Sequence, residues 1–141
     1  MIRVLVDSGS TKTDWMIQNE KTQKLLRWQT RGINPSLMND TQIIEILVSE
    51  VRPKILNFLQ FSLDDASMKS ENSRDDSLKT SISSTSSLVH SLRFYGSGCR
   101  PEQCERMQHL LSTTLMAQDV VVASDLLGAA RALCGNQSGI V

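Results

Sequence analysis

The chain of 141 residues has the length of a single domain, and its 40% hydrophobic content is enough for a buried core. Fifteen basic residues balance fifteen acidic ones, so bulk charge does not attract the chain to nucleic acid or to an anionic membrane. The apolar run after Met1 stops at Asp7, too early for a signal peptide or a membrane span. We therefore expect a cytoplasmic protein with no nucleic-acid or membrane partner. Its three cysteines lack the spacing of a zinc site and are expected to be reduced.

The first third of the chain predicts three strands. Residues 2–6 form an apolar run typical of a buried strand, a second strand begins at Trp15, and residues 24–30 make a third. The short polar links between them favour an antiparallel meander. Residues 31–35 contain a glycine before an Asn-Pro pair and predict a loop, because the residue before proline avoids the α region.

A polar segment rich in hydroxyl groups joins the first two strands: Asp7-Ser8-Gly9-Ser10-Thr11-Lys12-Thr13-Asp14. An aspartate at a strand end can hold hydrated Mg²⁺, while Gly9 lets the backbone approach phosphate groups and the hydroxyls supply donors. A plain hairpin turn has the same composition, since Gly, Ser and Asp favour turns for conformational reasons. The segment alone leaves both interpretations open.

The middle of the chain predicts one long helix and a polar insertion. Apolar residues recur at helical spacing over residues 40–61, with Asn39 or Asp40 as N-cap. Pro53 lies within this helix and is expected to kink or divide it. Residues 62–87 contain ten serines and few large apolar residues, so we expect a disordered insertion.

The last part predicts two strands that alternate with helices. Residues 92–95 form a strand that ends in a glycine-rich turn, and a helix starts at Pro101. Residues 119–124 read as a strand buried on both faces, of the kind found in parallel sheets. Asp125 closes this strand and caps a helix over residues 126–133.

This order predicts an α/β fold. Three antiparallel strands are followed by parallel strands with crossover helices, which gives a mixed five-stranded sheet flanked by helices. It matches half of the actin-like fold that sugar kinases, heat-shock chaperones and acetate kinase share. The sheet of that fold is of the ribonuclease H-like type.

Four motifs in the expected order resemble one family. The segment from Asp7 to Asp14 is similar to the first phosphate motif of the N-acetylglucosamine kinase-like proteins, which are grouped with the ATPases that activate benzoyl-CoA reductase and 2-hydroxyacyl-CoA dehydratase. The other three resemble the family's Gly-x-Asn-Pro loop, glycine-rich strand end and strand-Asp-helix segment; they are Gly32-Ile33-Asn34-Pro35, Tyr95-Gly96-Ser97-Gly98-Cys99 and the stretch from Ser124 to Ala132. The resemblance spans nearly the whole chain apart from the serine-rich insertion.

The resemblance implies an ATP-dependent kinase that phosphorylates an amino sugar such as N-acetylglucosamine, with ATP and Mg²⁺ as cofactors. Asp125 is the implied catalytic base, which takes the proton of the sugar hydroxyl; the alternative is that it only caps its helix. Asp7 is implied to hold the metal. The implied nucleotide contacts are Ser8, Gly9, Ser10, Thr11, Lys12 and Thr13, and the implied sugar contacts are Asn34 and the amides of Ser97 and Gly98.

Kinases of this fold clamp ATP between two similar lobes. A second phosphate loop is expected to follow Ile140 and Val141, so we expect residues 1–141 to be the N-terminal lobe of a protein about twice as long. The isolated lobe is expected to be inactive, and its exposed inter-lobe face allows association into a homodimer. Two alternatives stay open: an activator ATPase with an iron–sulfur cluster at a dimer interface, and a non-catalytic interaction module.

Overall fold

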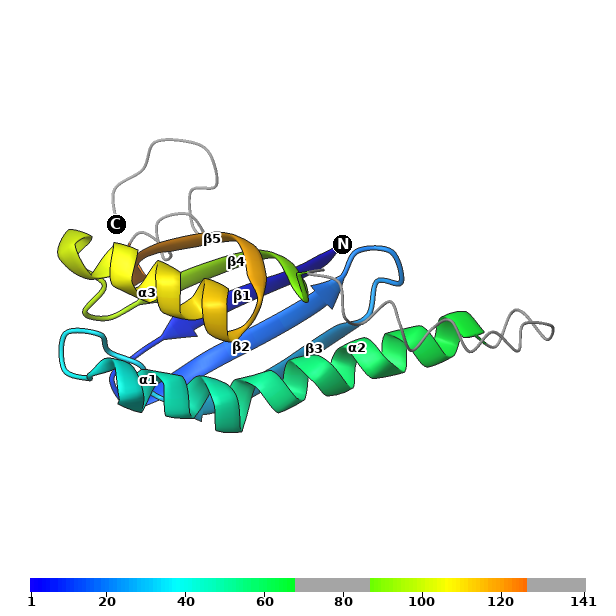
Figure 1. Cartoon of the computed structure of the whole chain (residues 1–141), viewed down its shortest axis with the longest axis horizontal. Coiled ribbons are helices and arrows are strands. Elements are labelled where there is room, and N and C mark those ends of the chain that lie inside the picture. The colour runs from blue at the N-terminus through cyan, green and yellow to red at the C-terminus, as the bar shows by residue number, and fades with distance from the viewer. Residues whose placement is uncertain (68–86, 127–141) are drawn as a thin grey trace.

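A computed structural model describes residues 1–67 and 87–126 (Figure 1). The strands are β1 (Ile2–Ser8), β2 (Lys12–Asn19), β3 (Leu25–Arg31), β4 (Val89–Gly96) and β5 (Ala117–Ser124). The helices are α1 (Asp40–Ile46), the π-helical stretch η1 (Leu47–Val51), α2 (Arg52–Ser67) and α3 (Pro101–Thr114). None of the helices in the described residues is long and apolar enough to cross a membrane.

The five strands form one mixed sheet with the order β3-β2-β1-β4-β5. The pairs β1–β2 and β2–β3 are antiparallel, whereas β1–β4 and β4–β5 are parallel. Between β3 and β4 the chain passes through α1, η1 and α2. Between β4 and β5 it passes through α3. The predicted α/β class and mixed five-stranded sheet are therefore confirmed.

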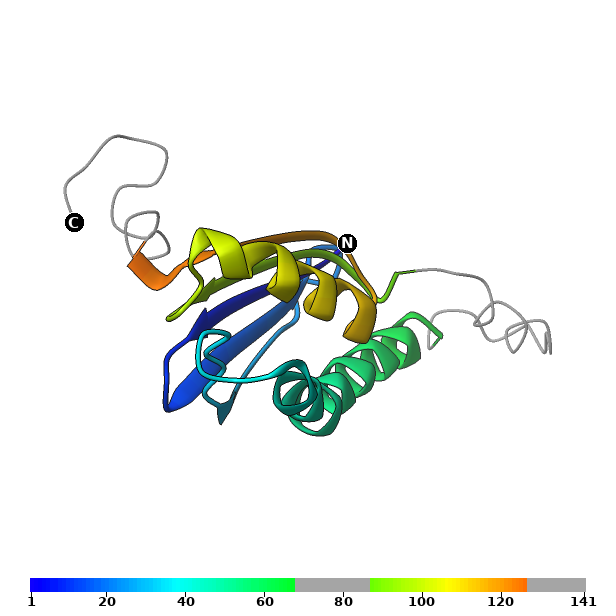
Figure 2. The same cartoon turned by 60° about the vertical axis from the view of Figure 1, so that its left-hand side comes forward.

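Within the described residues, helices cover one face of the sheet. Along β1, Ile2, Val4 and Val6 are buried in the same core as Ile43 of α1 and Met107 of α3. Figures 1 and 2 show α1 and α2 running along the β2–β3 side of this face and α3 along the β4–β5 side. Alternate residues of each strand point to the other face.

The second face of the sheet is exposed at β1, so the expectation that residues 2–6 form a fully buried strand is wrong. Leu5 is 43% exposed, and the residues before and after it on the same face are Arg3 and Asp7, both exposed. The strand alternates because only one of its faces is packed against helices in the described part of the chain. β5 is not buried on both faces either, since Asp119 is exposed and residues 121–124 are half-buried.

The long helix differs in detail from its prediction. Asn39 caps α1 through a capping box with Gln42. The π-helical turn η1 ends directly before Arg52 and Pro53, and the Arg52 amide donates to the carbonyl of Leu47. A proline ring clashes with the carbonyl four residues earlier, so widening the helix here accommodates Pro53 without a break.

Other helix and strand boundaries also differ from their predictions. α2 continues to Ser67, so residues 62–67 are helical and do not belong to a disordered insertion. β4 and β5 begin three and two residues earlier than predicted, because pairing with β1 and with each other extends them beyond their most apolar residues. Residues 68–86 of the predicted insertion, residues 127–133 of the predicted helix and the apolar residues 140–141 lie outside the described residues.

Candidate functional site

Three parallel strands end at the same edge of the sheet. Ser8 of β1 pairs with Gly96 of β4, which pairs with Ser124 of β5. The residues that follow therefore leave the sheet side by side, and these are Gly9, Ser97 and Asp125. The carboxyl edge of parallel strands is where open α/β sheets bind ligands.

A pocket of about 480 Å³ lies at this edge. It brings together Asn34, Gly98 and Asp125, which the sequence assigned to sugar binding and catalysis from three separate parts of the chain. Its remaining lining residues are Ser36, Leu37, Gly96, Cys99, Arg100, Pro101 and Ser124.

Asp125 is exposed at the first turn after β5. Its Oδ1 accepts a hydrogen bond of 3.0 Å from the Leu126 amide, and its Oδ2 accepts one of 3.2 Å from the Ser97 hydroxyl. The carboxylate is thereby fixed in orientation, whereas the amides two and three residues further on, which a helix cap would bond, lie outside the described residues. It also keeps lone pairs on both oxygens for a proton from another group.

Ser97 joins the site through its side chain. Its amide, which the resemblance assigned to the sugar, donates instead to the Ser8 carbonyl at 2.9 Å and prolongs the contact between β1 and β4. Its hydroxyl holds Asp125 in place. Ser97 is thus a neighbour that orients the carboxylate.

Asn34 lies at the pocket on the loop formed by residues 32–39, which we call the 32–39 loop. Asn34 Oδ1 accepts from the Ser36 amide at 3.0 Å, and Asn34 Nδ2 lies 3.5 Å from Ser10 Oγ. The Ser36 hydroxyl donates to the Gly98 carbonyl at 2.8 Å. Two side chains of this loop therefore link it to the segments that follow β1 and β4.

Gly98 must be glycine in this arrangement. Its φ of +73° lies in the left-handed region, and a Cβ atom would lie 1.9 Å from Asn34 Oδ1. Any side chain here would displace Asn34, so the close approach of the two segments explains the glycine.

The 9–12 turn between β1 and β2 borders the same edge. The Gly9 amide donates to the Lys12 carbonyl at 2.8 Å, and the Gly32 amide donates to the Thr11 carbonyl at 3.1 Å. Ser10, Thr11 and Lys12 are exposed. The turn thus presents three polar side chains to solvent, while the Gly9 amide is bonded within the turn.

Ser8 and Thr13 flank this turn but are fully buried. Their hydroxyls lie 2.8 Å apart, and Ser8 Oγ also donates to the Ile33 carbonyl and accepts from the Ile33 amide. Thr13 Oγ1 donates to the Arg31 carbonyl at 3.0 Å. These side chains shape the turn and the adjoining 32–39 loop, which leaves phosphate contact to the exposed residues between them.

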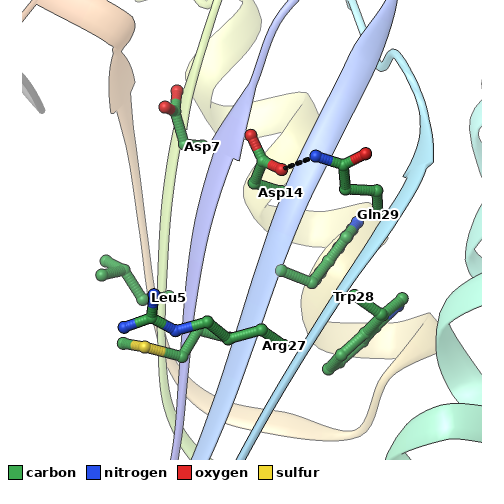
Figure 3. A pocket seen from close by; sticks show the side chains of 8 residues that line it. Leu5, Asp7, Asp14, Arg27, Trp28 and Gln29 are labelled. Atoms are coloured by element: carbon green, nitrogen blue, oxygen red, sulfur yellow. Dashed lines mark hydrogen bonds between the residues drawn. The ribbon is translucent and has the colours of Figure 1, made fainter.

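Asp7 projects from the open face of the sheet, one residue before Ser8. It lines a second hollow of about 530 Å³ and stands opposite Asp14, whose Oδ1 accepts from Gln29 Nε2 at 2.6 Å (Figure 3). Within the described residues, no three His, Cys, Asp or Glu side chains gather as a metal site. In proteins, Mg²⁺ is often held by one or two carboxylates together with phosphate and water. Two carboxylates that face each other on paired strands repel, and a bound cation relieves this repulsion. Asp7 therefore fits a Mg²⁺ site.

Cys99 lies beneath the pocket as a buried residue. Burial, with smaller contributions from Cys104 and Asp125, raises the pKa of its thiol to about 12. The thiol is therefore protonated near neutral pH and is a poor nucleophile. Cys99 therefore packs as a small apolar residue.

Two residues near the site had no role in the sequence-based reasoning. Ser36 was detectable, since it directly follows the Asn-Pro pair. Arg106 was not, because it reaches the 32–39 loop from α3, and its contact with Pro35 spans 71 residues.

No protein-family model matches the chain, and no curated protein matches it either. The family resemblance therefore rests on its sequence motifs alone.

Proposed function

We propose that this chain is the N-terminal lobe of an ATP-dependent kinase that phosphorylates an amino sugar such as N-acetylglucosamine. The observation that carries the proposal is the pocket in which Asn34, Gly98 and Asp125 meet beside the 9–12 turn. Residues for the sugar, the proton and the phosphates then lie at one edge of the sheet. A second lobe completes the nucleotide site.

The sheet topology supports the finer fold assignment. The order β3-β2-β1-β4-β5, with β2 antiparallel to its neighbours, is what a ribonuclease H-like lobe of the actin type requires. In such a lobe the turn after β1 and the residue after β5 face the nucleotide and the acceptor.

Asp125 acts as the general base in this proposal. A sugar hydroxyl is a weak nucleophile near pH 7, and a carboxylate within hydrogen-bond distance can take its proton as the O–P bond forms. The Ser97 hydroxyl and the Leu126 amide fix the orientation of the carboxylate. The remaining lone pairs are available for the sugar hydroxyl.

The 9–12 turn receives the phosphates. Gly9 permits close approach of the backbone, and the exposed hydroxyls of Ser10 and Thr11 and the charge of Lys12 contact the phosphate oxygens. Asp7 would hold Mg²⁺, which would supply positive charge to neutralise the phosphate oxygens of ATP, the donor of the phosphoryl group.

The proposal is tested with the intact protein, including its second lobe. Incubation with ATP, Mg²⁺ and a panel of amino sugars and neutral hexoses is expected to yield a phosphorylated amino sugar, detected by mass spectrometry. Absence of any sugar phosphate would contradict the proposal. Bound iron with visible absorbance would instead favour the activator ATPase. Residues 1–141 alone are expected to bind nucleotide weakly and to transfer no phosphate.

A further inference from the structure

Arg106 of α3 makes an unusual set of contacts with the 32–39 loop. Its Nη1 donates to the Pro35 carbonyl and its Nη2 to the Met38 carbonyl, both at 2.7 Å. Its Nε pairs with the carboxylate of Asp40, the first residue of α1. Nη1 also donates to Gln103 Oε1 at 2.9 Å.

These contacts use all three nitrogens of the guanidinium group. The group is planar and its donors point in fixed directions, so it sets the positions of its acceptors relative to one another. A lysine has a single ammonium group and cannot bond Pro35, Met38 and Asp40 in the same geometry. The Arg106 side chain is 28% exposed, so its bonds to Pro35, Met38 and Gln103 are partly shielded from water, whereas the Asp40 side chain is 60% exposed.

The loop that Arg106 holds carries three residues of the pocket, Asn34, Ser36 and Leu37. Pro35 lies between Asn34 and Ser36, and Arg106 itself does not line the pocket. Any influence of Arg106 on a ligand there therefore passes through the loop.

The other end of the loop is fixed by different groups. Ile33 is bonded to the buried Ser8, and the Arg31 side chain and amide bond Glu50 of η1. Loss of Arg106 would release the part after Asn34 and leave the part before it in place. The expected consequence is a misplaced sugar-binding loop on an intact sheet.

We propose that Arg106 is a positioning residue that sets Asn34 and Ser36 against Gly98 and thereby determines affinity for the sugar. This inference rests on the proposed function, because it takes the ligand of the pocket to be the sugar. It assigns Arg106 no contact with the sugar, the nucleotide or the reacting atoms.

The kinetic test uses the intact protein with Arg106→Ala and Arg106→Lys. KM for the sugar is expected to rise about 10-fold or more in Arg106→Ala, because small displacements of positioning groups have effects of this size. KM for ATP and kcat should change far less, and Arg106→Lys should recover only part of the loss. Arg93→Ala is the matched control, since Arg93 is also a partly exposed arginine paired with an aspartate, Asp119, away from the loop.

A structural readout separates this inference from the proposed function. Hydrogen exchange of the 141-residue chain should accelerate at Ser36 and Leu37 in Arg106→Ala, and not in Arg93→Ala. If the wild-type protein phosphorylates amino sugars and both alanine variants share its sugar KM, Arg106 has no positioning role and the inference fails while the function stands. If the wild type phosphorylates no sugar, the proposed function fails, and the role of Arg106 in sugar affinity fails with it.

Discussion

The two segments that border the pocket are held in different ways. The 32–39 loop is fixed by side chains from three directions: Ser8 within β1, Arg106 on α3, and its own Ser36 bonded to Gly98. The 9–12 turn is held mainly by backbone bonds, from Gly9 to Lys12 and from Gly32 to Thr11.

This difference suggests how the site divides its work. In the proposed kinase, the loop on the sugar side would be organised before a ligand arrives, which would lower the entropic cost of binding a small molecule. The turn on the phosphate side exposes the side chains of Ser10, Thr11 and Lys12, which a highly charged ligand would order through strong hydrogen bonds. Variants that alter one side, or that remove the bonds between the two, separate their roles.

The largest effect is expected from Asp125→Asn in the intact protein. Loss of a general base typically reduces turnover about 10²–10⁴-fold, while binding of sugar and nucleotide is retained because neither segment depends on this carboxylate for its shape. Initial rates and equilibrium binding measure the two effects. Asp119→Asn, an exposed aspartate of β5, is the control, and equal turnover in both variants would remove Asp125 as the base.

Gly98→Ala should damage the sugar side selectively. The added Cβ cannot fit 1.9 Å from Asn34 Oδ1, and a positive φ costs alanine about 1 kcal/mol or more. Sugar KM should rise while the affinity for ATP changes little. Gly9→Ala serves as the counterpart, since its Cβ would lie 3.3 Å from the Lys12 carbonyl oxygen, and it should weaken ATP binding instead. Identical profiles for the two variants would contradict a divided site.

Ser8→Ala tests the buried bonds that join the two segments. It leaves the amide and carbonyl of Ile33 without their side-chain partner, while the Thr13 hydroxyl keeps its bond to the Arg31 carbonyl, and it should lower the free energy of unfolding by about 1–3 kcal/mol. Ser10→Ala removes an exposed hydroxyl and should change it by less than about 0.5 kcal/mol. Urea denaturation of the 141-residue chain compares the two, and equal stabilities would mean that Ser8 does not hold the loop.

The smallest effect concerns Glu50, which anchors the residue before the 32–39 loop. The hydrogen bond from the Arg31 amide is the main cause that holds the pKa of Glu50 below its ordinary value of 4.5. Its stabilising contribution is therefore present above pH 4.5 and is lost as the pH falls through the lowered value. The stability difference between wild type and Glu50→Gln should shrink as the pH is lowered from 7 to about 3. A difference that does not change over this range would contradict the assignment.

Local patterns in the sequence predicted most of the fold. The apolar runs, the Asn39 cap and the Pro101 helix start predicted the order of the elements, because each depends on neighbouring residues. The open sheet face was not predicted, since an apolar run such as residues 2–6 fits a strand buried on one face or on both. Strand ends were misplaced because pairing partners far along the chain determine them.

The site was accessible to sequence reasoning only in part. Asn34, Gly98 and Asp125 could be named because they belong to short motifs. The burial of Ser8 and Thr13 was hidden, since a hydroxyl in a polar turn looks the same whether it faces solvent or a neighbouring loop. Arg106 gave no signal at all, because its partners are remote in the chain.

In the proposed function, nucleotide and sugar meet where β1, β4 and β5 end. An NMR titration of the ¹⁵N-labelled 141-residue chain with Mg-ATP and with N-acetylglucosamine tests it most directly, because chemical shifts report weak binding residue by residue. Mg-ATP is expected to shift the amides of the 9–12 turn, and the sugar those of Asn34 and Gly98. Shifts confined to the open face of the sheet around Met16 and Arg27, or no response to either ligand at roughly millimolar concentration, would contradict the claim.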